Sequence, residues 1–233
     1  MLRYYLMPER DALPAGEFAS WLRQARDSLR SPGVGMNVPC GECIACCRAS
    51  LFIHIRPGET QTLARIPKEL LFPVPGLPKG HVLMGYNERG ECPMLQDGRC
   101  SIYEHRPFTC REFDCRVLAA AGVELNEPAQ AEIAARARRW KFEFGGDEAR
   151  SESAAVRAAA KYLHENREHF PSGSLPANPT QLAALAIKVY EVFVGSLRDE
   201  SDPHDNRPPT AHPQIVHAIL ATLESFEAGT PAA

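Results

Sequence analysis

Cysteine is the residue type through which this sequence could do chemistry, and its distribution is uneven. All eight cysteines lie between Cys40 and Cys115, and four of them form the run Cys40-Gly-Glu-Cys43-Ile-Ala-Cys46-Cys47. A lone buried cysteine acts as a small hydrophobic residue. Short Cys-x-x-Cys loops instead let several thiolates turn toward one centre while backbone amides bond to the sulfur atoms. The run therefore predicts a metal site.

The other cysteines form a second block, which contains Cys92, Cys100, Cys110 and Cys115. We expect both blocks to fold into a single knot around metal. A disulfide framework is the alternative, because secreted scaffolds also use an even number of cysteines. The apolar run within residues 1–10 is too short for a signal peptide, and a proline and an acidic residue follow it. We therefore expect a cytoplasmic protein with reduced thiols.

A hairpin signal in the second block predicts how the cysteines divide. Asp-Gly at 97–98 is typical of a two-residue β-hairpin turn, which pairs Leu95 with Cys100 and Cys92 with Tyr103. Side chains alternate between the faces of a strand, so Cys92 and Cys100 then point to opposite faces, unless the proline after Cys92 ends the pairing earlier. Two centres would then divide the ligands into Cys40, Cys43, Cys46 and Cys92 in one set and Cys47, Cys100, Cys110 and Cys115 in the other. A single centre with noncoordinating cysteines is the alternative.

The spacing also bears on which metal is bound. Cys-x-x-Cys-x-x-Cys with a distant Cys-Pro is the ligand pattern of a [4Fe-4S] cluster in ferredoxin-like sites. Zinc sites commonly use two Cys-x-x-Cys pairs, and the second block contains no such pair. Adjacent Cys46 and Cys47 also cannot both point comfortably at one small ion. The pattern favours an iron-sulfur cluster, and Zn²⁺ remains the alternative.

Arginines flank the second block, at Arg106, Arg111 and Arg116. A guanidinium close to a thiolate-ligated cluster would neutralise its negative charge and raise its reduction potential, so Arg106 and Arg111 are candidate cofactor-binding residues. The alternative is surface ion pairing, which contributes only about 0–1 kcal/mol per pair. The acidic residues available for such pairs are Glu104, Glu112 and Asp114.

Several pieces of this region, in order, resemble one known family. The pieces are Cys40-x-x-Cys43-x-x-Cys46-Cys47, Cys92-Pro93, Gly98-x-Cys100-Ser-Ile-Tyr103, Arg106-Pro107 and Cys110-Arg111. Together they resemble the YkgJ-type cysteine cluster family of zinc- or iron-chelating proteins, and also the cysteine region of flagellin lysine methylases. The resemblance implies a metal-binding domain and its ligand positions, but no reaction, since no methyltransferase domain is identifiable in this chain.

Helical segments surround the cysteine region and must position it. Apolar residues recur at helical spacing in three sets: Phe18, Trp21, Leu22, Ala25 and Leu29; Ile133, Ala137, Trp140 and Phe144; and Val156, Ala159, Ala160 and Leu163. Asn178-Pro179 predicts the start of a further helix, because asparagine caps helices and proline suits their first turn. The chain thus divides into a helical segment at 1–36, a cysteine-cluster domain at 37–125 and a helical region at 126–233. The predicted fold is mainly α, with a small irregular or short-β metal knot and a helical C-terminal region.

Composition excludes some classes of function. The chain has 233 residues, 44% of them hydrophobic, and a formal net charge of -3. This charge argues against nonspecific nucleic-acid binding, which needs a basic surface, and no segment reaches the length of a membrane span. Phosphate-binding loops and hydrolase motifs are also missing. The sequence therefore predicts a metal-binding protein with one or two iron-sulfur clusters and an unassigned reaction, partner and substrate. The alternative is a structural zinc module that acts as an adaptor.

The Cys43→Ser variant should bind less metal and should destabilise residues 40–115. That stretch contains all eight cysteines, so its folding is expected to depend on metal ligation. Metal analysis and thermal unfolding of the purified variant check this. Wild-type metal content together with wild-type unfolding would exclude Cys43 as a ligand.

Overall fold

The computed structural model describes residues 12–31, 36, 38, 40–194 and 212–228. By contacts between residues, the chain divides into two compact units. The described parts of the first unit are 12–30, 116–123, 137–194 and 212–228, and those of the second are 31, 36, 38, 40–115 and 124–136. The division into 1–36, 37–125 and 126–233 stays a prediction about separately folding parts.

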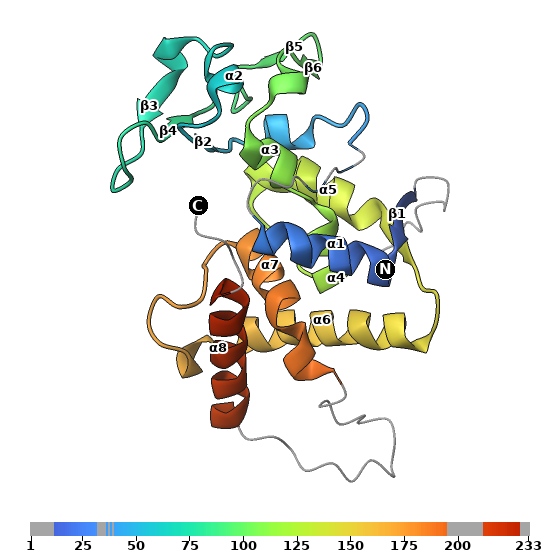
Figure 1. The fold of residues 1–233 in the computed structure, drawn as a ribbon. Coiled ribbons are helices and arrows are strands. Elements are labelled where there is room, and N and C mark those ends of the chain that lie inside the picture. The colour runs from blue at the N-terminus through green and yellow to red at the C-terminus, as the bar shows by residue number, and fades with distance from the viewer. Residues whose placement is uncertain (1–11, 32–35, 37, 39, 195–211, 229–233) are drawn as a thin grey trace, which may run out of the picture. The chain divides into compact units, whose positions relative to one another are not determined.

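The first unit is mainly helical, and its helices pack through small side chains. Its elements are β1 (Leu13–Glu17), α1 (Phe18–Arg30), α4 (Arg116–Ala121), β7 (Trp140–Glu143), α6 (Asp147–Glu165), η6 (Arg167–His169), α7 (Pro179–Val189), η7 (Tyr190–Phe193) and α8 (His212–Ala228). Helix α7 lies against α6 and α8 (Figure 1). Buried Ala159 of α6 and Ala183 and Ala186 of α7 allow close packing. Asn178 caps α7 as predicted, because its side chain accepts the N–H groups of Thr180 and Gln181.

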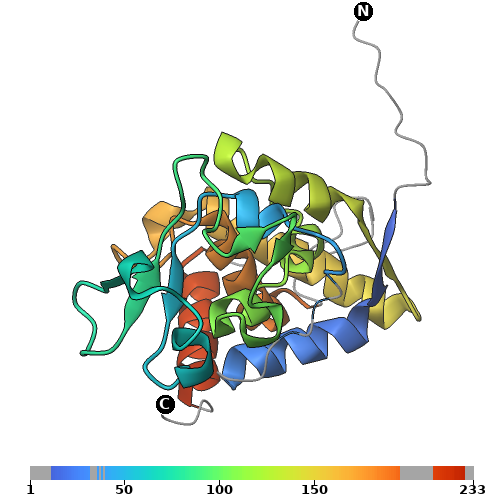
Figure 2. The ribbon, with the colours of Figure 1, turned by 90° about the horizontal axis from the view of Figure 1, so that it is seen from above.

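The predicted helix that includes Trp140 is shorter than expected. The stripe that includes Trp140 and Phe144 predicted a continuous helix, but Trp140 begins strand β7, which pairs in parallel with β1 (Figure 2). Apolar and polar residues alternate in Trp-Lys-Phe-Glu, which suits a half-buried strand. Phe18 meets Phe142 edge to face, with ring centroids 5.1 Å apart. Tertiary pairing with β1 therefore overrides the helical spacing.

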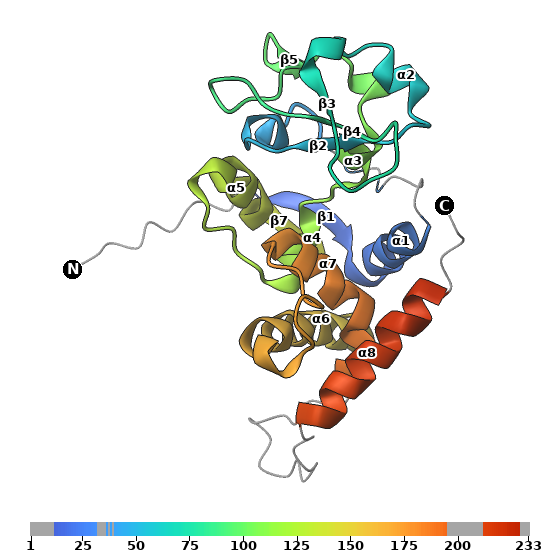
Figure 3. The ribbon, with the colours of Figure 1, turned by 90° about the vertical axis from the view of Figure 1, so that its left-hand side faces the viewer.

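The second unit contains short strands and short helices. Its elements are η2 (Ala45–Arg48), β2 (Ile53–Ile55), α2 (Thr60–Leu63), η3 (Lys68–Leu70), β3 (Leu71–Pro73), β4 (Val82–Met84), β5 (Leu95–Gln96), β6 (Arg99–Cys100), η4 (Tyr103–His105), α3 (Phe108–Glu112) and η5 (Pro128–Gln130). Helix α5 (Ala131–Arg139) begins in this unit. An antiparallel sheet has the order β2-β4-β3 (Figure 3). The proline-rich stretch 67–78 contains the 3-10 turn η3 and the edge strand β3, where Pro73 is tolerated.

The core of the second unit is a small apolar cluster under this sheet. Its buried side chains are Ile53, Ile55, Ile66, Met84, Met94 and Ile102. Three cysteines, Cys92, Cys100 and Cys110, pack against the cluster. The fold is therefore mainly α with a short-β cysteine-rich part and a C-terminal helix, as predicted. None of the helices in the described ranges is long and apolar enough to cross a membrane.

Candidate metal centre

One group of cysteines gathers around the first Cys-x-x-Cys loop. Among the other cysteines, Cys115 acts most strongly on the Cys46 thiol, followed by Cys40 and Cys43. The loop closes locally, since the N–H of Cys43 donates to the carbonyl oxygen of Cys40 at 2.9 Å. Cys115 follows helix α3 and is 9% exposed. We call Cys40, Cys43, Cys46 and Cys115 the first set.

A second group joins the end of the first block to the second block. Among the other cysteines, Cys92 and Cys100 act most strongly on the Cys47 thiol, and Cys43 and Cys40 act on it less. The pKa of Cys110 is raised first by burial and then by Cys92, Cys47 and Cys100. The N–H of Cys92 donates to the carbonyl oxygen of Cys47 at 2.6 Å, which fixes the two backbones side by side. We call Cys47, Cys92, Cys100 and Cys110 the second set.

Hydrogen bonds from neighbouring elements hold the second set in place. Helix α3 carries Cys110 and is tied to strand β2 by the Thr109 hydroxyl, which donates to the carbonyl oxygen of His54 at 2.7 Å. Cys100 ends strand β6, where it pairs with Leu95 across the hairpin. The Asp97-Gly98 turn has positive φ at both residues, as a type I′ turn requires. The predicted hairpin and its Leu95–Cys100 pair are therefore confirmed.

The hairpin ladder does not reach Cys92, so the pairing of Cys92 with Tyr103 that would place Cys92 and Cys100 on opposite faces does not form. The hairpin ladder stops at Leu95, and a turn closed by the Leu95 N–H on the Cys92 carbonyl oxygen, at 2.9 Å, precedes it. Pro93 lies in this turn and has no N–H for a ladder. The chain therefore bends at Cys92, which packs on the same apolar cluster as Cys100. These contacts favour a division in which Cys92 lies with Cys47, Cys100 and Cys110 and not with Cys40, Cys43 and Cys46.

Burial controls the ionisation of these thiols. It is the largest cause that raises the pKa of Cys40, Cys46, Cys92 and Cys110, and nearby thiolates add to it. The pKa of Cys47 rises to about 12, first through burial and then through Cys92. Although Cys46 has surface open to solvent, the surrounding protein still removes enough hydration to raise its pKa. Burial also raises the pKa of Cys92, but backbone N–H groups of Met94 and Leu95 oppose this rise by bonding to its sulfur.

Of the two candidate cofactor-binding arginines, only one has a described effect on the cysteines. Arg106 acts on Cys40 of the first set and on Cys110 of the second, and in both cases it lowers the pKa of the thiol. Its guanidinium is held over the Tyr103 ring, 4.1 Å from the centroid. Arg111 instead lies over Phe108, 5.5 Å from the centroid. Arg106 is thus the predicted arginine that the structure brings to the cysteines.

The other flanking arginine differs from its prediction. Arg116 does not lie on the surface beside the cysteines, but is 7% exposed in the first unit, where it donates to the carbonyl oxygen of Ala15 at 3.0 Å. Its guanidinium lies 6.0 Å from the centre of the Trp140 ring. The residue directly after Cys115 therefore serves the packing of the helical unit.

Two residues near Cys40 were missed by sequence analysis. Arg136 donates to the carbonyl oxygen of Cys40 at 3.5 Å and lowers the pKa of its thiol. Asp114 is 2% exposed and raises that pKa. In the sequence Arg136 looks like part of a solvated helix face, and only long-range contact brings it to the first block. The acidic residue next to Cys115 was assigned to surface pairing, and its burial carried no local signal.

The donor chemistry fits a thiolate-bound metal or cluster. All eight cysteines are described, and none of them forms a disulfide bond. Within the described ranges, no three His, Cys, Asp or Glu side chains form a group that could hold a single ion. The thiols of each set are therefore electrostatic neighbours without being at coordination distance. A bound cation would reverse the electrostatics, because it favours the thiolates that burial and crowding disfavour.

Comparison with known proteins agrees with this donor set. Residues 39–131 match the family model CxxCxxCC, described as "Putative zinc- or iron-chelating domain". This range includes both cysteine sets and ends in helix α5. No similar curated protein and no similar solved structure was found.

The metal-free protein should lose stability as the pH rises from about 9, the ordinary thiol value, toward about 12, the pKa of folded Cys47. Over this range the folded protein keeps a proton on Cys47 that the unfolded chain releases, so the free energy of unfolding falls with pH. Thermal unfolding of the metal-free protein at a series of pH values checks this. A Cys47→Ser variant is the control and should show a smaller decline. Equal declines in the two proteins would show that Cys47 is not linked to folding in this way.

Proposed function

We propose that the CxxCxxCC domain at residues 39–131 holds two metal centres, one on each set of four cysteines. The observation that carries this proposal is the backbone hydrogen bond of 2.6 Å that joins Cys92 to Cys47, together with the packing of Cys92, Cys100 and Cys110 on one apolar cluster. The Cys46 thiol is instead affected most by Cys115 among the cysteines. Adjacent cysteines thus serve different sets. Four thiolates are a complete ligand set for a zinc ion or for a [4Fe-4S] cluster. Metal binding would draw the thiols of each set together.

Iron-sulfur clusters are the proposed occupants. The amides of Met94 and Leu95 bond to the Cys92 sulfur, and such bonds stabilise cluster thiolates and tune their reduction potentials. Arg106 supplies positive charge near both sets, which would offset the negative charge that a thiolate-bound cluster carries. When bound, the clusters would supply redox or radical-type chemistry, and the reducing cytoplasm is the proposed compartment. The reaction and its substrate stay unassigned.

A structural zinc module is the second candidate function. The specific observation that favours it is the size of the apolar cluster in the second unit, which consists of six buried side chains. Small domains of this kind commonly depend on a metal for their fold. In this case the metal would hold the cysteine blocks together, and the protein would act as an adaptor.

Anaerobic purification distinguishes the two candidates. Protein from iron-replete cells should be brown, should contain iron and acid-labile sulfide, and should lose visible absorbance on reduction, because iron-sulfur clusters absorb visible light and zinc thiolates do not. Iron, sulfide and zinc analysis of the same sample checks this. Stoichiometric zinc without sulfide would overturn the iron-sulfur proposal in favour of the structural module.

Single substitutions test the two sets. Cys115→Ser should remove the metal of the first set and leave about half of the wild-type content, and Cys92→Ser should do the same for the second set. The double variant should then lose both halves, because the substitutions act on different centres. Metal analysis of the three variants checks this. The two-set division is wrong if the double variant retains as much metal as either single variant.

A further inference from the structure

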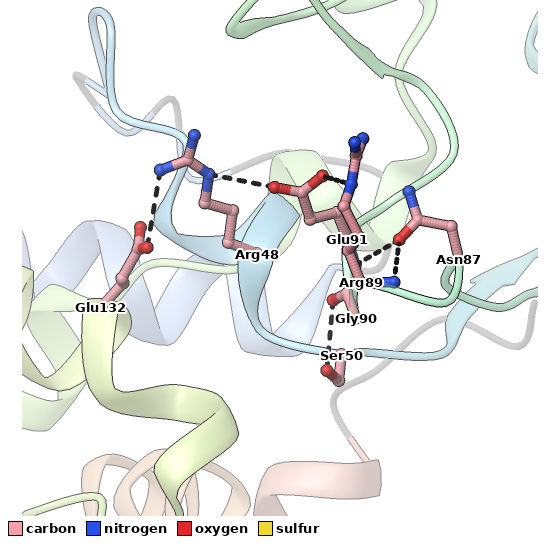
Figure 4. Close-up of polar contacts among 7 residues, drawn as sticks. All are labelled: Arg48, Ser50, Asn87, Arg89, Gly90, Glu91 and Glu132. Atoms are coloured by element: carbon pink, nitrogen blue, oxygen red, sulfur yellow. Dashed lines mark hydrogen bonds and ion pairs between the residues drawn. The ribbon is translucent and has the colours of Figure 1, made fainter.

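Two segments that carry Cys47 and Cys92 run side by side and are joined by several hydrogen bonds. Beyond the bond from the Cys92 N–H to Cys47, the N–H of Ser50 donates to the carbonyl oxygen of Gly90 at 3.0 Å. The Ser50 hydroxyl donates to the same oxygen at 3.1 Å (Figure 4). Ser50 lies three residues after Cys47, and Gly90 lies two residues before Cys92. The pairing therefore fixes the register of the two cysteines.

The turn that presents Gly90 is closed around one side chain. The amide oxygen of Asn87 accepts the N–H groups of Arg89 at 2.9 Å and of Glu91 at 3.0 Å (Figure 4). Backbone bonds close the same turn, from the Asn87 N–H to Glu91 at 2.8 Å and from the Gly90 N–H to Asn87 at 2.9 Å. An asparagine that binds amides ahead of it in this way shapes a turn without support from regular structure. Asn87 thus determines the backbone positions of Glu91 and of Cys92, which follows it.

Ion pairs add to this contact but do not control it. Glu91 lies 3.5 Å from Arg48 and 3.0 Å from Arg89, and Arg48 also lies 3.6 Å from Glu132 (Figure 4). The side chains of Arg48 and Arg89 are 43% and 77% exposed. Exposed ion pairs contribute little because water screens them. The neutral hydrogen bonds of Ser50 and Asn87 are therefore the stronger part of the contact.

The backbone at the contact adopts conformations that its surroundings must impose. Ser50 has φ of 50°, which is uncommon for a residue other than glycine. Gly90 has φ of 76°, and a Cβ atom there would lie 2.5 Å from the Ser50 hydroxyl oxygen. Such conformations persist where surrounding interactions fix them, often at functional sites. Here the fixed point is the approach of the two cysteine-bearing segments.

We infer that Ser50, Asn87 and Gly90 form a clamp that positions Cys47 against Cys92 and sets how tightly the second set holds its metal. This inference rests on the proposed function, because it assigns the two cysteines to one centre. The clamp residues are positioning residues, since they shape the backbone that carries the ligands and are not ligands themselves. The first set takes no ligand from the segment that carries Asn87, Gly90 and Cys92, so its metal should be affected less than that of the second set.

The test compares Asn87→Leu with Asn87→Asp in the full chain. Asn87→Leu removes the accepting oxygen at similar size, whereas Asn87→Asp retains an accepting oxygen. Release of metal to a chelator should become biphasic in the leucine variant, with about half of the metal leaving 10- to 100-fold faster, the usual effect of losing a residue that supports a ligand. The aspartate variant should release metal like the wild type. Ser50→Ala removes one hydrogen bond and keeps the Cβ atom. It should also accelerate release of the metal of the second set, but by a smaller factor.

Amide hydrogen exchange of the metal-free protein gives a readout that does not depend on metal. The Cys92 N–H should exchange faster in Asn87→Leu than in Asn87→Asp or the wild type, because the clamp holds its bond to Cys47. The clamp proposal is wrong if the Cys92 N–H exchanges at the wild-type rate in Asn87→Leu. It is also wrong if this variant releases the metal of both sets faster by the same factor. If Asn87→Leu does not fold, Ser50→Ala decides by the same two measurements. A wild-type protein that binds no metal overturns the proposed function, whereas the exchange result still decides the clamp.

Discussion

Burial of several thiols close together is the constraint on which the second unit depends. Burial is the largest cause that raises the pKa of the thiols of Cys40, Cys46, Cys47, Cys92 and Cys110, and neighbouring thiols add to it. Without a cation these five thiols are disfavoured as thiolates, and the remaining stabilisation comes from a small apolar cluster, the short sheet and turn hydrogen bonds. A metal changes the sign of the electrostatic contribution, since it binds the thiolates that the protein otherwise suppresses. The arrangement of the cysteines and the folding of the unit are therefore coupled to metal binding.

The local geometry of the chain explains how two sets arise from one run of cysteines. Cys46 and Cys47 are neighbours in the turn η2, and their thiols are grouped with different partners. The turn at Pro93 and the hairpin bring Cys92 and Cys100 to one side of the apolar cluster. Cys115, beyond helix α3, is left to the first set. The clamp of Ser50, Asn87 and Gly90 then holds Cys47 of the first block against Cys92 of the second.

Prediction from sequence succeeded where the signal was local. The Asp97-Gly98 hairpin and the Asn178 cap depend on residues within a few positions, and both form as expected. It failed where distant segments compete, as at Trp140, which leaves a helical pattern to pair with β1. The contact of Cys92 and Cys100 with one apolar cluster could not be predicted either, because it depends on where the hairpin ladder ends. Arg136 could not be found at all, because nothing near it in sequence indicates its contact with Cys40.

The most direct measurement is a crystal structure of the anaerobically prepared, metal-loaded protein, with anomalous scattering recorded at the iron and zinc absorption edges. The two-set arrangement predicts two separate iron sites. Cys40, Cys43, Cys46 and Cys115 should surround one of them, and Cys47, Cys92, Cys100 and Cys110 the other. A single metal site, or a site where Cys92 shares its metal with Cys40 and Cys43, would contradict it.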